Sequence, residues 1–301
     1  MSRIDEALRR VRGAAGPLEP EPSGTEAFLP AWPVTERREA LDTHSVPILT
    51  DPEVGEGPGA LEPRGPDRQL SISSEWRERL ATGSGGDPTL VEQFRRLAGT
   101  LHHARQSHGL RSVMVTSAGP NDGKTLTSIN LALVLAESYR YRVLLVDADL
   151  RRPSITNVVE LVEGRGLSEA LSSPTPQKLA LAQLAPGLTL LPAGRPTMNS
   201  IEALVSPRMQ QILDEALAKF DWVILDAPPV GPTADARLLS QMAGGTLFVI
   251  RAGKSQYPEV LEAIEIVGRD QILGVVLNDV ETGPSDGYYY VAEAQTAKSR
   301  F

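Results

Sequence analysis

The chain has 301 residues, 41% of them hydrophobic and 23% charged, with a formal net charge of -8 and no cysteine. This composition is typical of a globular protein, and its acidic balance argues against nucleic acid as a partner, since phosphate backbones attract basic surfaces. Disulfides, thiolate catalysis and Cys-type zinc sites are excluded. The four histidines lack the spacing of a metal site, and we expect them on the surface.

The first 86 residues are predicted to be a largely disordered region. A short helix is indicated at residues 2–12, and it either docks on another surface or frays, because so short a helix is not stable alone. Residues 13–70 are rich in Pro, Gly and Glu, and they bury too little apolar surface to offset the entropy of ordering. A second short helix is predicted at residues 73–80, before a glycine-rich stretch.

From residue 87 onwards, short apolar runs alternate with segments of helical spacing. Candidate strands are residues 112–116, 143–147, 188–191, 222–226, 246–250 and 274–278. Candidate helices are residues 90–101, 124–138, 207–219, 235–241 and 258–268. This alternation predicts an α/β domain over residues 87–283, with a doubly wound, mostly parallel sheet and helices on both faces. Ligands of such sheets bind at the carboxyl ends of the strands.

Residues 118–125 read Ala-Gly-Pro-Asn-Asp-Gly-Lys-Thr and fit the phosphate-binding pattern G-x-x-x-x-G-K-[ST], with Ala at the first position. They follow a predicted strand and open a predicted helix. We expect the backbone N–H groups of this phosphate loop to hold phosphate oxygens. Lys124 is predicted to reach the β/γ-phosphates and the Thr125 hydroxyl to bind Mg²⁺, so ATP and Mg²⁺ are the expected cofactors. The predicted nucleotide-binding residues here are Gly119, Pro120, Asn121, Asp122, Gly123, Lys124, Thr125 and Leu126.

Carboxylates end two of the predicted strands. Asp147 and Asp149 follow the apolar run that starts at residue 143, and Asp226 follows the run that starts at residue 222. Asp226 fits the acid that holds Mg²⁺ in phosphate-loop enzymes, and the other two share a face if the strand stays regular. The alternative is that these residues cap following helices. Together with Lys124, the three acids favour metal-assisted phosphoryl transfer.

Three segments carry a family resemblance. Residues 116–125, 144–153 and 223–229 resemble the Walker A, A′ and B motifs of the exopolysaccharide-associated bacterial tyrosine autokinases. The Asp-Ala-Asp-Leu-Arg-Arg-Pro run is the most specific part, and the resemblance covers about residues 87–290. The start of the chain, Ser-Arg-Ile-Asp-Glu-Ala-Leu, resembles the stand-alone members found in exopolysaccharide operons.

The resemblance implies roles for the acids and for one amide. Asp149 and Asp226 are expected to support the metal together with Thr125, and Asp147 is the candidate base that takes the proton of the acceptor tyrosine. Asn278 resembles the residue that contacts adenine in related ATPases, although a turn-forming Asn is the alternative.

The family phosphorylates tyrosines of its own C-terminal cluster, largely between subunits. The predicted acceptors, in a tail of residues 284–301, are Tyr288, Tyr289 and Tyr290. A partly buried tail or a strand edge is the alternative for this triplet. Three adjacent tyrosines, however, cannot all face one core from a strand.

The resemblance also implies partners and location. It implies a homo-oligomer of the chain itself, a membrane-embedded polysaccharide chain-length or co-polymerase protein as activator, and a cognate tyrosine phosphatase. With no run of eighteen apolar residues and no apolar signal core, we expect a cytoplasmic protein, peripheral to the inner membrane through a partner. Glu92 and Arg95 match the assembly motif Glu-x-x-Arg-x-x-Arg, but Ala98 stands at its third position and Arg96 is displaced by two residues.

Two other functions use the same scaffold. A Min/Par-type partition ATPase places a second lysine early in the phosphate loop, where this chain has Gly119. A non-catalytic, nucleotide-dependent regulator of a polysaccharide-export complex is the other alternative. Motifs of eukaryotic-type kinases are absent from the sequence.

Overall fold

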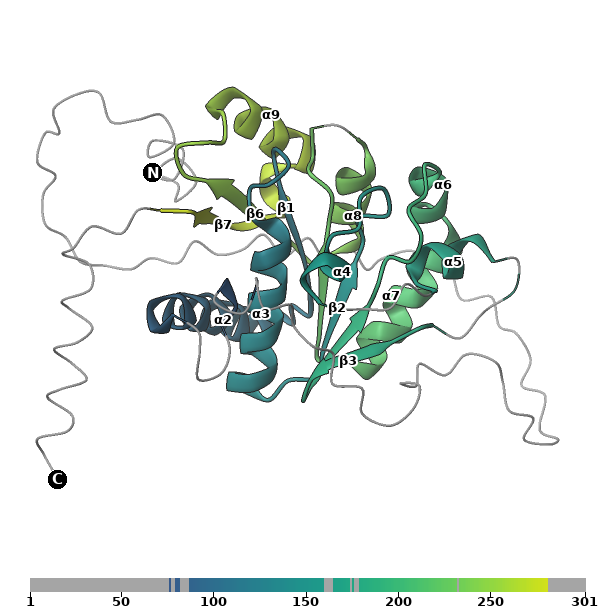
Figure 1. Ribbon diagram of the computed structural model, residues 1–301, viewed down its shortest axis with the longest axis horizontal. Coiled ribbons are helices and arrows are strands. Elements are labelled where there is room, and N and C mark those ends of the chain that lie inside the picture. Colours follow the sequence, from purple (N-terminus) through teal and green to yellow (C-terminus); the bar gives the residue numbers. More distant parts are fainter. Residues whose placement is uncertain are drawn as a thin grey trace, which may run out of the picture.

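A computed structural model gives the fold (Figure 1). It describes residues 76, 79–81, 87–159, 165–173, 175, 179–231 and 233–280. The predicted helix at residues 2–12 lies outside the described residues, as do residues 73–75, 77 and 78 of the helix predicted at 73–80. Among the described helices, none is both long and apolar enough to cross a bilayer.

A seven-stranded sheet in the order β3-β4-β2-β5-β1-β6-β7 forms the centre of the domain. Its strands are β1 (Ser112–Ser117), β2 (Val143–Asp147), β3 (Ala182–Ala185), β4 (Leu188–Leu191), β5 (Trp222–Asp226), β6 (Thr246–Arg251) and β7 (Ile272–Asn278). All neighbouring strands run parallel except the β3–β4 pair at one edge. The predicted mostly parallel sheet is therefore confirmed.

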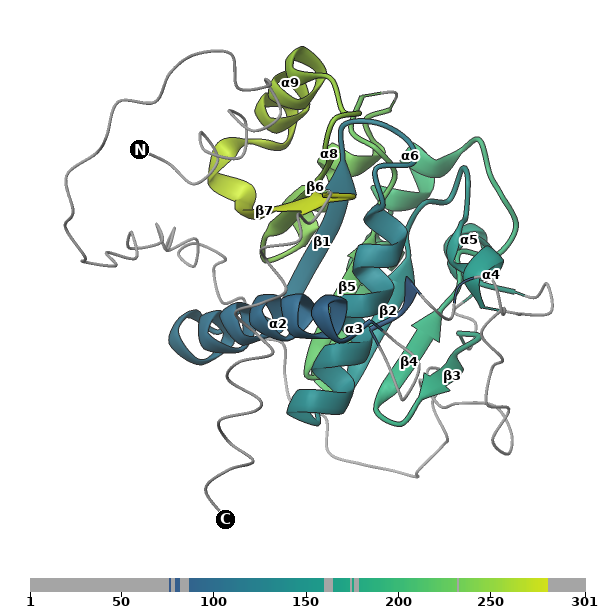
Figure 2. The ribbon, with the colours of Figure 1, turned by 60° about the vertical axis from the view of Figure 1, so that its left-hand side comes forward.

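Helices cover both faces of the sheet (Figures 1 and 2). They are α2 (Pro88–His108), α3 (Lys124–Tyr139), α4 (Ile155–Val158), α5 (Leu167–Ser172), α6 (Ser200–Leu204), α7 (Pro207–Lys219), α8 (Asp235–Met242), α9 (Tyr257–Val267) and the 3-10 turn η3 (Arg269–Gln271). In β1, Val113 and Val115 pack with α2 and α3, whereas Met114 packs with α7 and α8 on the opposite face. Strands apolar on both sides are thus explained by separate cores on the two faces of the sheet, with a third cluster formed by β6, α8 and α9.

Local sequence accounts for where the helices begin and end. Asp87 caps α2 by accepting a hydrogen bond from Thr89 N, Pro88 occupies the first turn, and the helix ends at Gly109 in the left-handed conformation. Ser206 caps α7 by accepting a hydrogen bond from Met209 N, and Pro207 begins the helix. Both helices expose polar faces and bury one apolar stripe, which packs on α3 in the case of α2 and on β5 in the case of α7.

The predicted elements agree closely with the structure where apolar runs were long. The predicted bounds of β2, β4, β5 and α7 are those observed, and the remaining predicted strands and helices α3, α8 and α9 differ by one or two residues at either end. Five short elements among the described residues were missed: β3, α4, α5, α6 and η3. Each has only three to six residues, which is too few to show a period.

The expectation that all the histidines lie on the surface was wrong for His102. Its ring is half-buried, packs 4.8 Å from the Tyr139 ring, and lies with Nδ1 2.7 Å from the Tyr141 hydroxyl. Within α2, an apolar stripe lies next to polar positions, so position 102 borders the face that packs on α3. Its neighbour His103 is exposed as expected.

Candidate active site at the phosphate loop

The phosphate loop connects the end of β1 to the first residue of α3. Two of its residues have positive φ, Asn121 at 64° and Gly123 at 97°. Gly123 needs to be glycine for a second reason, because a Cβ added there would overlap Asn278 Nδ2. The loop therefore turns sharply into α3, and the first N–H groups of that helix have no carbonyl one turn back to bond. Such N–H groups are available for an anion.

Lys124 and Thr125 open α3 and face the acids across the loop. The Lys124 side chain is largely buried, and its Nζ lies 4.0 Å from Asp149 Oδ2. Thr125 Oγ1 is 2.7 Å from Ser154 Oγ, in the segment between β2 and α4. The Leu126 side chain packs against the apolar core that α2 and α3 share, and it thereby supports the phosphate loop.

The carboxyl ends of β2 and β5 bring two aspartates level with each other. Asp147 and Asp226 are register partners, and Asp226 pairs on its other side with Val115 of β1. The end of β5 therefore lies beside β1, the strand that leads into the phosphate loop, and the end of β2 lies one strand further away. Asp149 lies two residues beyond the end of β2, where its Oδ1 accepts from Arg152 N.

Hydrogen bonds hold one oxygen of each paired carboxylate. Asp226 Oδ1 accepts from Ser128 Oγ at 3.0 Å, and Asp147 Oδ2 accepts from Ile155 N at 3.2 Å. The other oxygens, Asp226 Oδ2 and Asp147 Oδ1, are buried and have no hydrogen-bond partner among the described residues. Buried carboxylate oxygens of this kind are costly unless a cation or donor satisfies them.

Burial and mutual repulsion raise the pKa of these acids. Burial raises the pKa of Asp226 to about 6, although the charge of Lys124 and the hydrogen bond from Ser128 act in the opposite direction. For Asp147, burial and then the neighbouring charge of Asp226 hold the pKa well above its usual range. Burial also raises the pKa of Asp149, against hydrogen bonding from Arg152 and the charge of Lys124. The three acids therefore have less neighbouring positive charge than they would need to ionise as easily as exposed aspartates.

The residues present fit Mg²⁺ better than a metal enclosed by protein ligands. The described residues contain no group of three His, Cys, Asp or Glu side chains arranged to hold a metal. Mg²⁺ commonly takes one or two carboxylates and completes its shell with water and phosphate. The unpartnered Asp226 oxygen, the Thr125 hydroxyl and the nearby phosphate loop provide that combination.

Four supporting contacts were not foreseen from the sequence. Ser128, one turn after Lys124, bonds Asp226, and Ser154 bonds Thr125. Arg151 Nε lies 2.9 Å from Asp235 Oδ2, which also accepts from Ser200 Oγ at 2.7 Å. Only Ser128 carried a readable signal, because a residue four positions after Lys124 lies on the same face of the helix.

The remaining predicted residues fall in different places. Asn278 donates from Nδ2 to Asp122 O at 2.9 Å, so its amide contacts the phosphate loop itself. On α2, the Glu92 carboxylate forms two surface ion pairs. Its Oε2 lies 3.9 Å from Arg95 Nη1, and its Oε1 lies 3.7 Å from Arg96 Nε. Ala98, at the third position of the predicted assembly motif, is fully buried. The predicted acceptors lie outside the described residues: Tyr288, Tyr289 and Tyr290.

Known sequences match this chain over most of the domain. The family model described as the CobQ/CobB/MinD/ParA nucleotide binding domain matches residues 113–298, more than half of the chain. Tyrosine-protein kinase YwqD of Bacillus subtilis strain 168 is 34% identical over 202 residues, which cover 66% of this chain and 85% of that relative. Tyrosine-protein kinase etk of Escherichia coli strain K12 is 31% identical over 266 residues, which cover 85% of this chain but 36% of the relative.

Solved structures agree with these matches. The kinase domain of Escherichia coli tyrosine kinase ETK has a TM-score of 0.61 at 33% identity, covering 65% of this chain and 78% of that chain. The chimerical protein CapA2B2 has a TM-score of 0.60 at 30% identity, covering 65% of this chain and 87% of that chain. The chain therefore belongs to the CobQ/CobB/MinD/ParA nucleotide-binding family and, within it, to the bacterial tyrosine-protein kinases.

Proposed function

We propose that this chain is a tyrosine autokinase that uses ATP and Mg²⁺ to phosphorylate its own C-terminal tyrosines, Tyr288 to Tyr290. The observation that carries the proposal is the position of Lys124, which heads α3 behind the phosphate loop and faces Asp149. Beside it, Asp147 and Asp226 keep carboxylate oxygens without partners. A triphosphate and a divalent cation would satisfy the lysine and the acids together.

Each side chain has a task in the proposed reaction. The loop N–H groups and Lys124 hold the phosphates, and Thr125, Asp149 and Asp226 hold Mg²⁺. When bound, the ion neutralises charge on the phosphate oxygens. The tyrosine oxygen bonds to the γ-phosphorus, the bond to the β,γ-bridging oxygen breaks, and ADP leaves. Asp147 accepts the tyrosine proton, and its raised pKa makes it a stronger base than an exposed aspartate.

The adenine end of the nucleotide is assigned to Asn278. Its Nδ2 is committed to Asp122 O, which leaves the side-chain oxygen to accept from the exocyclic amino group of adenine. The proposed catalytic unit spans residues 87–283, and residues 284–301 are assigned to the acceptor tail. Residues 79–81 belong with the catalytic unit, because Leu80 and Ala81 are buried in its core and Ala81 N donates to Asn130 Oδ1.

The proposed setting is polysaccharide export. We assign regulation of exopolysaccharide synthesis or export to the kinase, with a membrane-embedded chain-length protein as activator and a cognate phosphatase that resets the tyrosines. The chain would then work in the cytoplasm, held at the inner membrane by its activator. The supporting observations are the motif resemblance and relatives named tyrosine-protein kinases.

Charge supplies a way for the modification to act. Each phosphate adds about −1.5 to −2 charge at neutral pH, so three phosphotyrosines would load a tail that must approach Asp147 and Asp149. Repulsion then favours release of the tail and loosens an oligomer. Sizing of phosphorylated and unphosphorylated protein tests this step, and equal sizes would contradict it.

The test of the proposed activity is phosphotyrosine formation by the purified full chain with Mg²⁺ and ATP. Wild type is expected to become labelled, whereas Lys124→Met and the triple Tyr→Phe variant at positions 288–290 are not. Lys219→Met, at the end of α7, is the matched control and should label like wild type. Mass spectrometry locates the modified residues. Labelling of Lys124→Met at the wild-type rate would overturn the proposal.

The same assay separates the two alternatives. A partition ATPase would release free phosphate while the protein stays unlabelled, and Gly119 at the position of the second lysine argues against that class. A non-catalytic regulator would bind nucleotide without either product. Its distinguishing result is a Lys124→Met form that retains full partner function in cells.

A further inference from the structure

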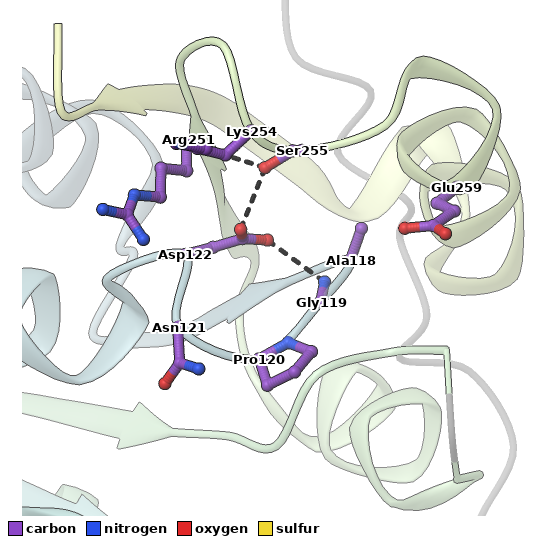
Figure 3. A pocket seen from close by; sticks show the side chains of 9 residues that line it. All are labelled: Ala118, Gly119, Pro120, Asn121, Asp122, Arg251, Lys254, Ser255 and Glu259. Atoms are coloured by element: carbon purple, nitrogen blue, oxygen red, sulfur yellow. Dashed lines mark hydrogen bonds between the residues drawn. The ribbon is translucent and has the colours of Figure 1, made fainter.

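A small pocket lies behind the phosphate loop, between that loop and the segment that joins β6 to α9 (Figure 3). Gly119 and Asp122 line it from the phosphate loop, and Ser255 lines it from the β6–α9 segment. Figure 3 shows the Asp122 side chain between these two walls, pointing towards Gly119 on one side and Ser255 on the other. This carboxylate belongs to the phosphate loop, yet both of its hydrogen bonds are made to groups of the protein itself.

Asp122 is only 5% exposed, and each of its carboxylate oxygens accepts one hydrogen bond. Oδ2 accepts from Gly119 N at 3.1 Å, and Oδ1 accepts from Ser255 Oγ at 2.9 Å. The first bond closes the loop on itself over three residues. The second bond joins the loop to a neighbouring element more than a hundred residues later in the chain.

Ser255 is itself fixed in position. Its hydroxyl oxygen accepts from Arg251 N at 2.9 Å, so the oxygen that donates to Asp122 is held by the end of β6. The backbone of Asp122 is held from another direction, because Asn278 Nδ2 donates to Asp122 O. Asp122 is therefore held from the ends of two strands, through Ser255 after β6 and through Asn278 at the end of β7.

A negative side chain beside a phosphate site is unfavourable for phosphate affinity by simple Coulomb repulsion. The contribution of Asp122 must then be to fix the shape of the phosphate loop. A phosphate cradle of backbone N–H groups acts best when its shape exists before the ligand arrives, since ordering the loop on binding would cost affinity.

We propose that Asp122 is a positioning residue for the nucleotide: it holds the phosphate loop in its cradle shape through Gly119 N–H and takes its own position from Ser255. This inference rests on the proposed nucleotide site. It assigns to Asp122 no contact with the nucleotide.

The first test is the affinity of the full chain for ADP with Mg²⁺, measured by calorimetry. Ser255→Ala leaves the phosphate loop sequence intact and is expected to raise Kd about three- to tenfold, the net worth of one typical hydrogen bond. Asp122→Ala is expected to raise Kd more than tenfold. Ser107→Ala, whose hydroxyl bonds within its own helix at His103 O, is the control and should leave Kd unchanged.

Two further variants separate positioning from charge and from general stability. Asp122→Asn can still accept from Gly119 N–H and can donate to Ser255 Oγ, so it should bind ADP as well as wild type or better. The double variant Asp122→Ala with Ser255→Ala should match Asp122→Ala alone, because Ser255 acts through Asp122. In the kinase assay, Ser255→Ala should raise KM for ATP in parallel with Kd while kcat stays within about twofold.

Three results would overturn the inference. They are an unchanged Kd in Ser255→Ala, a double variant whose Kd change is the product of the single changes, and an Asp122→Asn form that binds as poorly as Asp122→Ala. A wild-type chain with no Mg²⁺-dependent affinity for ADP would instead overturn the proposed function. Because Ser255→Ala leaves the loop sequence intact, it decides the matter even if Asp122→Ala does not fold.

Discussion

Asp147 and Asp226 lie side by side at the ends of β2 and β5, as register partners with no exposed surface. The charge on Asp226 is one of the causes that hold the pKa of Asp147 well above its usual range, after burial itself. Two adjacent acids in a buried position cannot both ionise cheaply. The pair therefore destabilises the folded protein, and a bound cation would reduce this cost.

The first prediction concerns stability and pH in the absence of Mg²⁺ and nucleotide. The folded pKa of Asp226, about 6, exceeds its unfolded value near 3.8, so its favourable contribution is complete below pH 3.8 and is lost as pH rises through 6. Asp226→Asn should therefore be more stable than wild type at pH 7.5, by up to about 3 kcal/mol. Urea unfolding at pH 5 and pH 7.5 measures the difference, which should shrink at pH 5.

Asp221 gives the matched control for that experiment. Burial alone would raise its pKa, but Arg142 hydrogen-bonds it and lowers the pKa below the usual value. Asp221→Asn should thus destabilise the protein at pH 7.5, opposite in sign to Asp226→Asn. If both substitutions change stability in the same direction at this pH, the interpretation of the buried pair is wrong.

A second prediction uses the close approach of Gly123 to Asn278. Gly123→Ala introduces a methyl group where Asn278 Nδ2 lies, at a φ of 97° that other residues rarely adopt. The expected cost is roughly 1–3 kcal/mol in unfolding free energy, with nucleotide affinity reduced more than tenfold. Adding Asn278→Ala should remove the overlap but not the backbone strain, so recovery is partial. Full additivity of the two losses in chemical denaturation would refute the contact.

The third prediction concerns the buried partner of Arg151. Asp235 is almost fully buried and is held by Arg151 and Ser200, so Arg151→Ala leaves a buried carboxylate short of its cation. Destabilisation of about 3 kcal/mol is expected. Arg151→Ala combined with Asp235→Ala should recover part of it, since the orphaned charge is gone. The control is Arg152→Ala, an exposed side chain, which should change stability by less than about 0.5 kcal/mol.

The fourth prediction separates assembly from folding on α2. Glu92 and Arg95 are exposed and form a surface ion pair, so alanine at either position should change the unfolding free energy by under about 1 kcal/mol. Any change in oligomer size seen by light scattering is then an effect on assembly.

Ala98→Arg, which would complete the family motif, should instead destabilise the fold by several kcal/mol, because position 98 is fully buried. A stable Ala98→Arg protein would show that α2 can shift.

Much of the fold could be predicted because apolar runs of five or six residues, bounded by polar turns, are strands buried on both faces. Elements of four to six residues, such as β3 and α4, could not be predicted, because their conformation depends on the elements around them. In the site, Lys124 and Asp226 were readable from motif spacing. Ser154 and Asp235 were not, since each meets a partner 29 or 84 residues away, and only the strand order brings them together.

The order of strands also has a consequence during synthesis. The phosphate loop leaves the ribosome early, but β5, which lies between β1 and β2, follows about a hundred residues later. Until then β1 and β2 lack the strand that joins them, and their apolar edges stand open to wrong pairing. The proposed nucleotide site is complete only after Asp226 and then Asn278 have been made, so we expect a nascent chain stalled before residue 222 to need a chaperone and to gain no protection from ATP.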